Sequence, residues 1–232
     1  MGNVAMLKLY GFVVSHYYSM VKHTLMAKGV AFEEVPVMPG ADPAYLAISP
    51  LGKIPAIETE QGYLSESGVI LDYIEARYTD VRLSPGDLFS QAKMKELMKI
   101  SELYVESPGR RLIPAALSGA TLDQAVLDDA ASTLRKGLGA IARLGHFKPY
   151  LMGEQMTLAD IVLRYSLVVI KGSAALPNMN TAAFVNIDIN DIVPGLATWE
   201  QRMRESPVSQ AIDAVVVEEM PKLMAQRQKK PD

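Results

Sequence analysis

Residues 48–75, ISPLGKIPAIETEQGYLSESGVILDYIE, contain the most informative pattern in this chain. Two short strand-like segments, 54–59 and 62–65, flank a polar turn, and an apolar run with helical spacing follows them. Pro55 lies at the start of the first segment, although a proline cannot donate a hydrogen bond to a neighbouring strand. The proline therefore indicates that its own backbone geometry is needed at this position.

The residues before this stretch continue a pattern of alternating strands and helices. Strands are predicted at 4–10 and 31–37, and helices at 19–29 and from Asp42-Pro43 onward. The quoted stretch adds two strands and a helix from Ser67 to about Tyr78, with Ser67 as its N-cap. The first 80 residues therefore spell β-α-β-α-β-β-α.

The residues that follow the polar linker 81–87 are almost wholly helical in pattern. Helices are predicted around 94–105, ending near Ser107-Pro108-Gly109, and at 127–141, 156–170 and 194–206. The third helix opens with Thr157-x-x-Asp160, close to a capping box, and its dense apolar content indicates the central helix of a bundle. Residues 172–193 lack clear periodicity. We predict an α/β domain at 1–80 and an all-helical domain at 88–232.

Composition excludes several classes of function. With 49% hydrophobic and 21% charged residues, the chain is expected to fold as a globule, and its net charge of −3 gives no reason to expect nucleic acid. No secretory signal opens the sequence, and its most apolar stretch, 158–170, is too short to span a membrane, so we expect a cytoplasmic protein. The chain has no cysteine, which excludes disulfides and a thiol nucleophile of its own. Its three scattered histidines give no reason to expect a metal.

Three motifs occur in this order along the chain: GKIPAI at 52–57, SESGVILDYI at 65–74 and YLMGEQMTLADIVL at 150–163. With them, the chain resembles a cytosolic glutathione S-transferase of the serine type, bacterial or fungal-like, over roughly residues 5–215. The resemblance implies a thioredoxin-like N-terminal domain, a helical C-terminal domain, glutathione as cosubstrate, and a homodimer. The implied reaction conjugates glutathione to a small hydrophobic electrophile, as in detoxification.

The resemblance also assigns residues to a glutathione site. It implies that Pro55 is cis, and that the backbone of Ile54 pairs with the cysteinyl part of the tripeptide. Ser67 would bind the γ-glutamyl carboxylate, Glu66 the ammonium group, and Lys53 the glycine carboxylate. Simpler alternatives stay open: a proline that ends a strand, a serine that only caps a helix, and a solvated lysine.

The group that activates the glutathione thiol is expected between the first strand and the first helix. The resemblance places the activating hydroxyl of serine-type members at Ser15, with Tyr17 and Tyr10 as alternatives. A loop serine that only bonds local backbone is the competing interpretation for Ser15. The family usually has a proline or another small residue after the serine, whereas this chain has His16.

The second substrate is expected in a cleft between the domains, bordered by His16, Tyr17, Tyr104 and Arg111. A non-catalytic regulatory or assembly protein of the same fold is an alternative, because a Ser-His-Tyr-Tyr sequence would be tolerated if no thiolate were needed. A glutathione-dependent isomerase or dehalogenase is a further alternative. Thiol–disulfide exchange is close to excluded, because it requires a cysteine in the protein.

Overall fold

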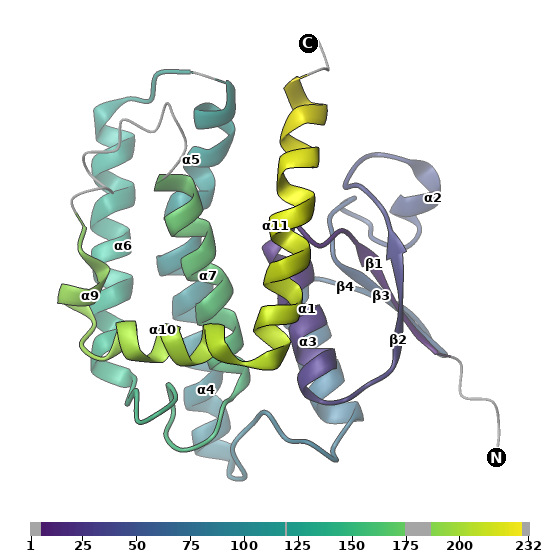
Figure 1. Cartoon of the computed structure of the whole chain (residues 1–232), viewed down its shortest axis with the longest axis horizontal. Coiled ribbons are helices and arrows are strands. Elements are labelled where there is room, and N and C mark those ends of the chain that lie inside the picture. Colours follow the sequence, from purple (N-terminus) through teal and green to yellow (C-terminus); the bar gives the residue numbers. More distant parts are fainter. Residues whose placement is uncertain (1–5, 119, 175–186, 229–232) are drawn as a thin grey trace. The chain divides into compact units, whose positions relative to one another are not determined.

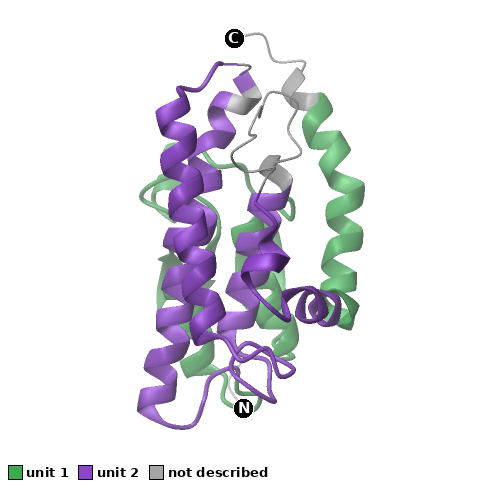
Figure 2. Cartoon of the chain, turned by 90° about the vertical axis from the view of Figure 1, so that its left-hand side faces the viewer, with its two compact units in different colours: residues 1–82, 204–232 green, residues 83–203 purple. Residues whose placement is uncertain are grey.

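A computed structural model describes residues 6–118, 120–174 and 187–228 (Figure 1). The chain divides into two compact units, residues 1–82 with 204–232 and residues 83–203, which Figure 2 colours separately. The domain ranges predicted above, 1–80 and 88–232, differ from this division in the C-terminal segment, which groups with the first unit because its helix packs against α1. Those two domain ranges remain a prediction.

The first unit is built on a sheet of four strands in the order β2-β1-β3-β4. The strands are β1 (Leu7–Gly11), β2 (Phe32–Pro36), β3 (Ala56–Thr59) and β4 (Gly62–Ser65). Strand β1 runs parallel to β2 and antiparallel to β3, and β3 pairs antiparallel with β4. The helices of this unit are α1 (His16–Ala27), α2 (Pro43–Leu46), α3 (Ser67–Arg77) and α11 (Pro207–Gln228). This order confirms the predicted β-α-β-α-β-β-α fold.

One face of this sheet is covered by α1 and α3, which contact each other, whereas α2 lies on the opposite side (Figure 1). Apolar residues at strand and helix periodicity form the core between them, because only those positions face inward. Among the described residues of this unit, the apolar side chains with no exposed surface are Leu9, Val21, Leu25, Ala56, Ile57, Ile70, Leu71 and Ile74.

The start of α1 and the N-cap of α3 differ from prediction. Helix α1 begins at His16 rather than at Ser19, because Ser15 is its N-cap and accepts a hydrogen bond from the backbone N–H of Tyr18. Helix α3 begins at Ser67 as predicted, but its N-cap is Glu66. Ser67 is therefore the first helical residue rather than the cap.

The second unit is helical. Its elements are α4 (Leu88–Ile100), the π-helix η1 (Ser101–Glu106), α5 (Ser107–Ser118), α6 (Gln124–Leu144), α7 (Leu158–Ala174), α9 (Ile189–Ile192) and the start of α10 (Leu196–Glu205). Helix α7 contacts α4, η1 and α5 and is buried along most of its length, as predicted for the central helix of a bundle. The segment 172–193, for which no structure was predicted, lies partly outside the described residues.

The predicted helix end near Ser107-Pro108-Gly109 is wrong, because α4, η1 and α5 follow one another without interruption. The π-helical turn hydrogen-bonds five residues apart rather than four, and this wider turn accommodates the ring of Pro108. The carbonyl oxygen of Tyr104 would lie 2.6 Å from a Cβ at Gly137. Only glycine therefore allows α6 to pack this closely on η1.

Within the described ranges, no helix combines the length and the apolar character that crossing a bilayer requires.

Candidate functional site

The predicted residues of the first unit gather at one end of the sheet. The register aligns Tyr10 of β1 with Ala56 of β3, and Ala56 with Ser65 of β4. The chain continues from these three positions to Gly11, back to Pro55, and on to Glu66. Since neighbouring strands lie about 4.8 Å apart, the three segments span roughly 10 Å, the length of an extended tripeptide.

The peptide bond between Ile54 and Pro55 is cis, as predicted. Strand β3 begins only after the proline, at Ala56. The backbone N–H and C=O of Ile54 form no hydrogen bond with another described residue. A Cβ at Gly11 would lie 3.3 Å from that of Ile54, so the end of β1 passes directly beside Ile54. The Ile54 backbone thus offers a donor and an acceptor at the edge of the site.

The loop before the proline is held rigidly by hydrogen bonds. The carbonyl oxygen of Lys53 accepts bonds from the hydroxyl of Tyr45 at 2.8 Å and from that of Ser49 at 2.7 Å. Gly52 has a φ of +60°, and a Cβ there would lie 2.0 Å from the carbonyl oxygen of Gly40, so the position requires glycine. These contacts fix the backbone of Lys53, whereas its side chain is exposed to solvent.

The start of α3 has an unusual geometry. Glu66 has a φ of 69°, which is rare and strained for a residue other than glycine. Its side chain makes no capping hydrogen bond, and the first turn of α3 carries no acidic residue. The N–H groups of this turn therefore keep their positive potential for an external anion. Glu66 itself is exposed and places a carboxylate next to that anion site.

Ser15 lies at the start of α1, half-buried. Its hydroxyl oxygen accepts the N–H of Tyr18 at 3.5 Å, so the local backbone contact weighed above exists. Accepting this bond uses a lone pair and leaves the hydroxyl proton available for donation. Ser15 can therefore cap the helix and donate to an anion at the same time.

The tyrosines near Ser15 differ in what their hydroxyls do. The hydroxyl of Tyr10 donates to Glu58, and that of Tyr18 donates to Glu34. Burial raises the pKa of both phenols, and the bonded carboxylates raise it further. Tyr10 is therefore a poor candidate for activating a thiol. The ring of Tyr17 lies 4.0 Å from that of His16, with both residues on the first turn of α1 rather than in a loop.

The remaining predicted residues, Tyr104 and Arg111, lie in the second unit. Tyr104 is 47% exposed on η1. Arg111 lies on α5 and pairs with Asp129 of α6 at 3.4 Å. Within the first unit, the strand register thus places Ile54, Pro55, Glu66 and Ser67 at the same end of the sheet, and Ser15 follows the strand end of β1 by four residues.

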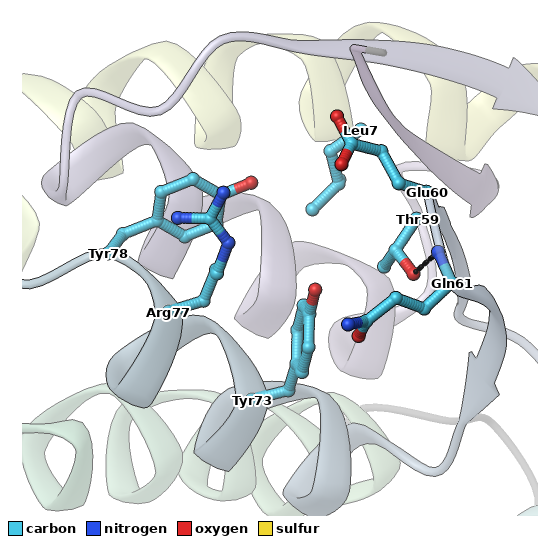
Figure 3. A pocket seen from close by; sticks show the side chains of 7 residues that line it. All are labelled: Leu7, Thr59, Glu60, Gln61, Tyr73, Arg77 and Tyr78. Atoms are coloured by element: carbon cyan, nitrogen blue, oxygen red, sulfur yellow. Dashed lines mark hydrogen bonds between the residues drawn. The ribbon is translucent and has the colours of Figure 1, made fainter. Parts of the chain in front are cut away.

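A pocket of about 180 Å³ in the first unit was not predicted (Figure 3). It lies between the β3–β4 turn and the C-terminal half of α3, and seven residues line it: Leu7, Thr59, Glu60, Gln61, Tyr73, Arg77 and Tyr78. No pattern in the sequence indicated it, because its walls come from segments that meet only in the fold. Among the described residues, no group of three or more His, Asp or Glu side chains is arranged to hold a metal ion.

Comparisons with known proteins agree with this architecture. A family model described as the glutathione S-transferase N-terminal domain matches residues 9–82. A glutathione S-transferase from Pseudomonas putida is 41% identical over 219 residues, covering 94% of this chain and 96% of that protein. The solved structure of glutathione S-transferase III in its apo form superposes with a TM-score of 0.70 at 28% identity, covering 91% of this chain and 97% of the other.

A more distant similarity points to another class of protein. A probable elongation factor 1-gamma from Arabidopsis thaliana is 28% identical over 120 residues, which is 52% of this chain but only 29% of that protein. The similarity to the Pseudomonas protein, in contrast, extends over nearly the full length of both chains. The chain therefore belongs to the glutathione S-transferase family of enzymes.

Proposed function

We propose that this enzyme binds reduced glutathione in its first unit, holds it as the thiolate, and conjugates it to a small hydrophobic electrophile. The observation that carries the proposal is the start of α3, where a strained Glu66 and an uncapped helix N-terminus lie one strand away from the cis Pro55. A strained non-glycine residue is retained where the surrounding structure or a ligand gains from it.

The chemistry of the tripeptide matches these groups. The γ-glutamyl end of glutathione carries a carboxylate and an ammonium group. Ser67 and the N-terminal turn of α3 suit the carboxylate, and the exposed Glu66 suits the ammonium. The backbone of Ile54 would pair with the cysteinyl residue as a further strand, and Lys53 would meet the glycine carboxylate.

Thiolate formation is the step assigned to Ser15. A free thiol has a pKa of roughly 8.5, so little thiolate is present at neutral pH. A hydroxyl that donates to the sulfur, at the positive end of a helix, lowers that value. Ser15 offers both features, since it caps the 12-residue α1 and retains its hydroxyl proton.

The electrophile, the dimer and a role in detoxification are proposed from family membership. His16 and Tyr17, whose rings lie close together at a tilt on the first turn of α1, are the candidates for contacting the electrophile from the first unit. From the second unit the candidates are Tyr104 and Arg111.

A non-catalytic role is the second candidate, because part of the chain is similar to a probable elongation factor 1-gamma. A protein that serves only as an interaction module has no use for a strained Glu66 beside an open helix terminus. This geometry favours the enzyme.

Calorimetric titration with reduced glutathione tests the proposal, with binding expected in the micromolar-to-millimolar range. The oxidised and S-methylated peptides serve as comparison ligands, because neither has a thiol that the site could ionise. Absence of binding by calorimetry and by a second method would reject the glutathione site and leave the interaction module.

A further inference from the structure

The pocket at the β3–β4 turn is separate from the glutathione residues along both elements that form it. Thr59 and Gly62 pair three positions along the hairpin from Ala56 and Ser65, which is about 10 Å at the strand rise. Arg77 lies ten residues after Ser67 on α3, which is about 15 Å along the helix. A ligand in this pocket would therefore leave the proposed glutathione site open.

The walls of the pocket carry opposite charges on two sides. Figure 3 shows Arg77 and Tyr78 on one side, Glu60 with Thr59 and Gln61 on the other, and the ring of Tyr73 between them. The hydrogen bond from the N–H of Gln61 to the hydroxyl of Thr59, at 3.2 Å, holds the turn that presents Glu60. The pocket thus has a cationic wall and an anionic wall around an aromatic middle.

Arg77 is available to a ligand. Its guanidinium lies 5.5 Å from the centre of the Tyr78 ring, within the range of a cation–π contact that orients the group. The residue is exposed, and within the described part of the chain it forms no ion pair. Burial raises the pKa of Tyr78, whereas the charge of Arg77 lowers it, and Tyr73 and Glu60 raise it further. The phenol of Tyr78 is therefore influenced by the charges of both walls.

The size of the pocket limits its ligand to about one ring. An engineered cavity of about 150 Å³ in another protein holds a single benzene molecule, and the present pocket measures about 180 Å³. The phenol rings of Tyr73 and Tyr78 offer flat apolar faces on which such a ring can pack. Leu7 contributes an apolar side chain that is buried.

We propose that this pocket binds a small zwitterion, with its carboxylate on Arg77, its ammonium group near Glu60 and a compact apolar body against Tyr73 and Tyr78. A simple anion would gain the contact with Arg77 but would also meet the charge of Glu60. A simple cation would gain the contact with Glu60 but would also meet the charge of Arg77. Only a ligand with both charges complements both walls.

The probe for the test is para-(aminomethyl)benzoate, a one-ring zwitterion with its charges at opposite ends. Its matched controls are para-toluate, which lacks the ammonium group, and para-methylbenzylamine, which lacks the carboxylate. Binding to the full chain is followed by ligand-observed NMR and calorimetry. The zwitterion is expected to bind at least about tenfold more tightly than either control, the effect of one charged hydrogen bond.

Variants place the binding in this pocket. Arg77→Met and Glu60→Gln are each expected to lower the affinity for the zwitterion by about tenfold. Arg82→Met and Glu33→Gln, at exposed positions that do not line the pocket, are expected to leave it unchanged. Circular dichroism checks that each variant is folded.

The proposal is overturned by absence of zwitterion binding at its solubility limit, by equal binding of all three probes, or by unchanged binding in Arg77→Met and Glu60→Gln. Saturating glutathione is expected to leave the affinity for the probe unchanged. Displacement of the probe by glutathione would assign it to the glutathione site and would equally reject a separate pocket.

Discussion

The starts of α3 and α7 show two opposite solutions to the same problem. Each helix begins with backbone N–H groups that have no partner within the helix. At α7, the buried carboxylate of Asp160 accepts four bonds: from the N–H of Leu151 at 2.7 Å, the N–H and hydroxyl of Thr157 at 2.8 and 2.9 Å, and the indole of Trp199 at 2.8 Å. At α3, Glu66 is exposed, strained and makes no capping bond.

The difference separates a structural terminus from a binding terminus. Asp160 joins the 151 loop, the start of α7 and α10 into one network, so it stabilises the second unit and offers nothing to a ligand. The start of α3 gives up that stabilisation and keeps its positive potential accessible.

Replacing Asp160 by alanine is expected to be the most damaging change. Four buried donors would lose their acceptor, which predicts a loss of about 3 kcal/mol or more in the free energy of unfolding. Trp199 is the single tryptophan of the chain, so its fluorescence during urea unfolding reports directly on this network.

The matched control is Asp188→Ala, which removes an exposed cap that bonds the N–H of Asn190. Its expected cost is about 1 kcal/mol. Equal losses in the two variants would show that the Asp160 network is no more than an ordinary cap.

Replacing Ser15 by alanine is expected to reduce kcat/KM with glutathione and a reactive aryl halide by about a hundredfold, the typical effect of removing one donor to a stabilised anion. The ultraviolet thiolate band of bound glutathione should titrate at higher pH in the variant. Tyr10→Phe is expected to change kcat/KM by about twofold at most, because its hydroxyl is engaged with Glu58. If Tyr10→Phe is the slower enzyme, the assignment to Ser15 is wrong.

Replacing Glu66 by glutamine is expected to weaken glutathione about tenfold, because it removes the charge facing the ammonium group while keeping the shape. The free energy of unfolding should hardly change. Glu66→Gly should bind as weakly but unfold at higher denaturant concentration, since glycine adopts a φ of 69° without strain. A loss of stability in these variants would place α3 in the same structural class as α7.

Acid titration is expected to give the smallest effect. Burial raises the pKa of Glu34, but hydrogen bonds from Lys22 and Tyr18 outweigh it and the pKa is lowered. A lowered pKa in the folded state contributes stability above the unfolded value of about 4.3, and this contribution is lost as the pH falls through the folded pKa.

Because Glu34 is partly exposed, the contribution is below about 1 kcal/mol after screening. Glu34→Gln should therefore unfold at the same denaturant concentration as the wild type near pH 3 and slightly earlier at pH 7. The pKa of Asp160 shifts in the opposite direction: burial raises it, and the four hydrogen bonds that lower it do not outweigh burial. If the wild type and Glu34→Gln differ in stability by the same amount at both pH values, ionisation of Glu34 does not contribute to stability.

Local pattern was enough to predict most elements of the first unit, because strand and helix periodicity follow from residues close in sequence. The turn at 60–61 and Asp42 as the cap of α2 are local events of this kind, whereas the strand predicted at 54–59 begins only at Ala56, after Pro55. The start of α1 was predicted three residues too late, and Ser67 was predicted as the cap of α3, since a serine can be the cap or the first helical residue.

The helical unit was less predictable where helices meet. Pro108 was interpreted as a helix end, but it follows a π-helical turn that packs next to Gly137, and the helix continues through it. Helix α11, for which no helix was predicted, continues through Pro221 without interruption. Neither outcome can be inferred from propensity, because both depend on the neighbouring helix.

Residues close together in the sequence were sufficient to predict the order of strands and helices, to exclude a cysteine thiol and to indicate the family to which the motifs belong. The sequence also indicated Pro55, Glu66 and Ser67, because their motif is contiguous. Tertiary structure alone decided which hydroxyl is committed and which is available, since the partners of Tyr10 and Tyr18 lie 48 and 16 residues away. It also formed the pocket between Glu60 and Arg77, because side chains distant in sequence acquire a common surface only when the sheet and α3 pack together.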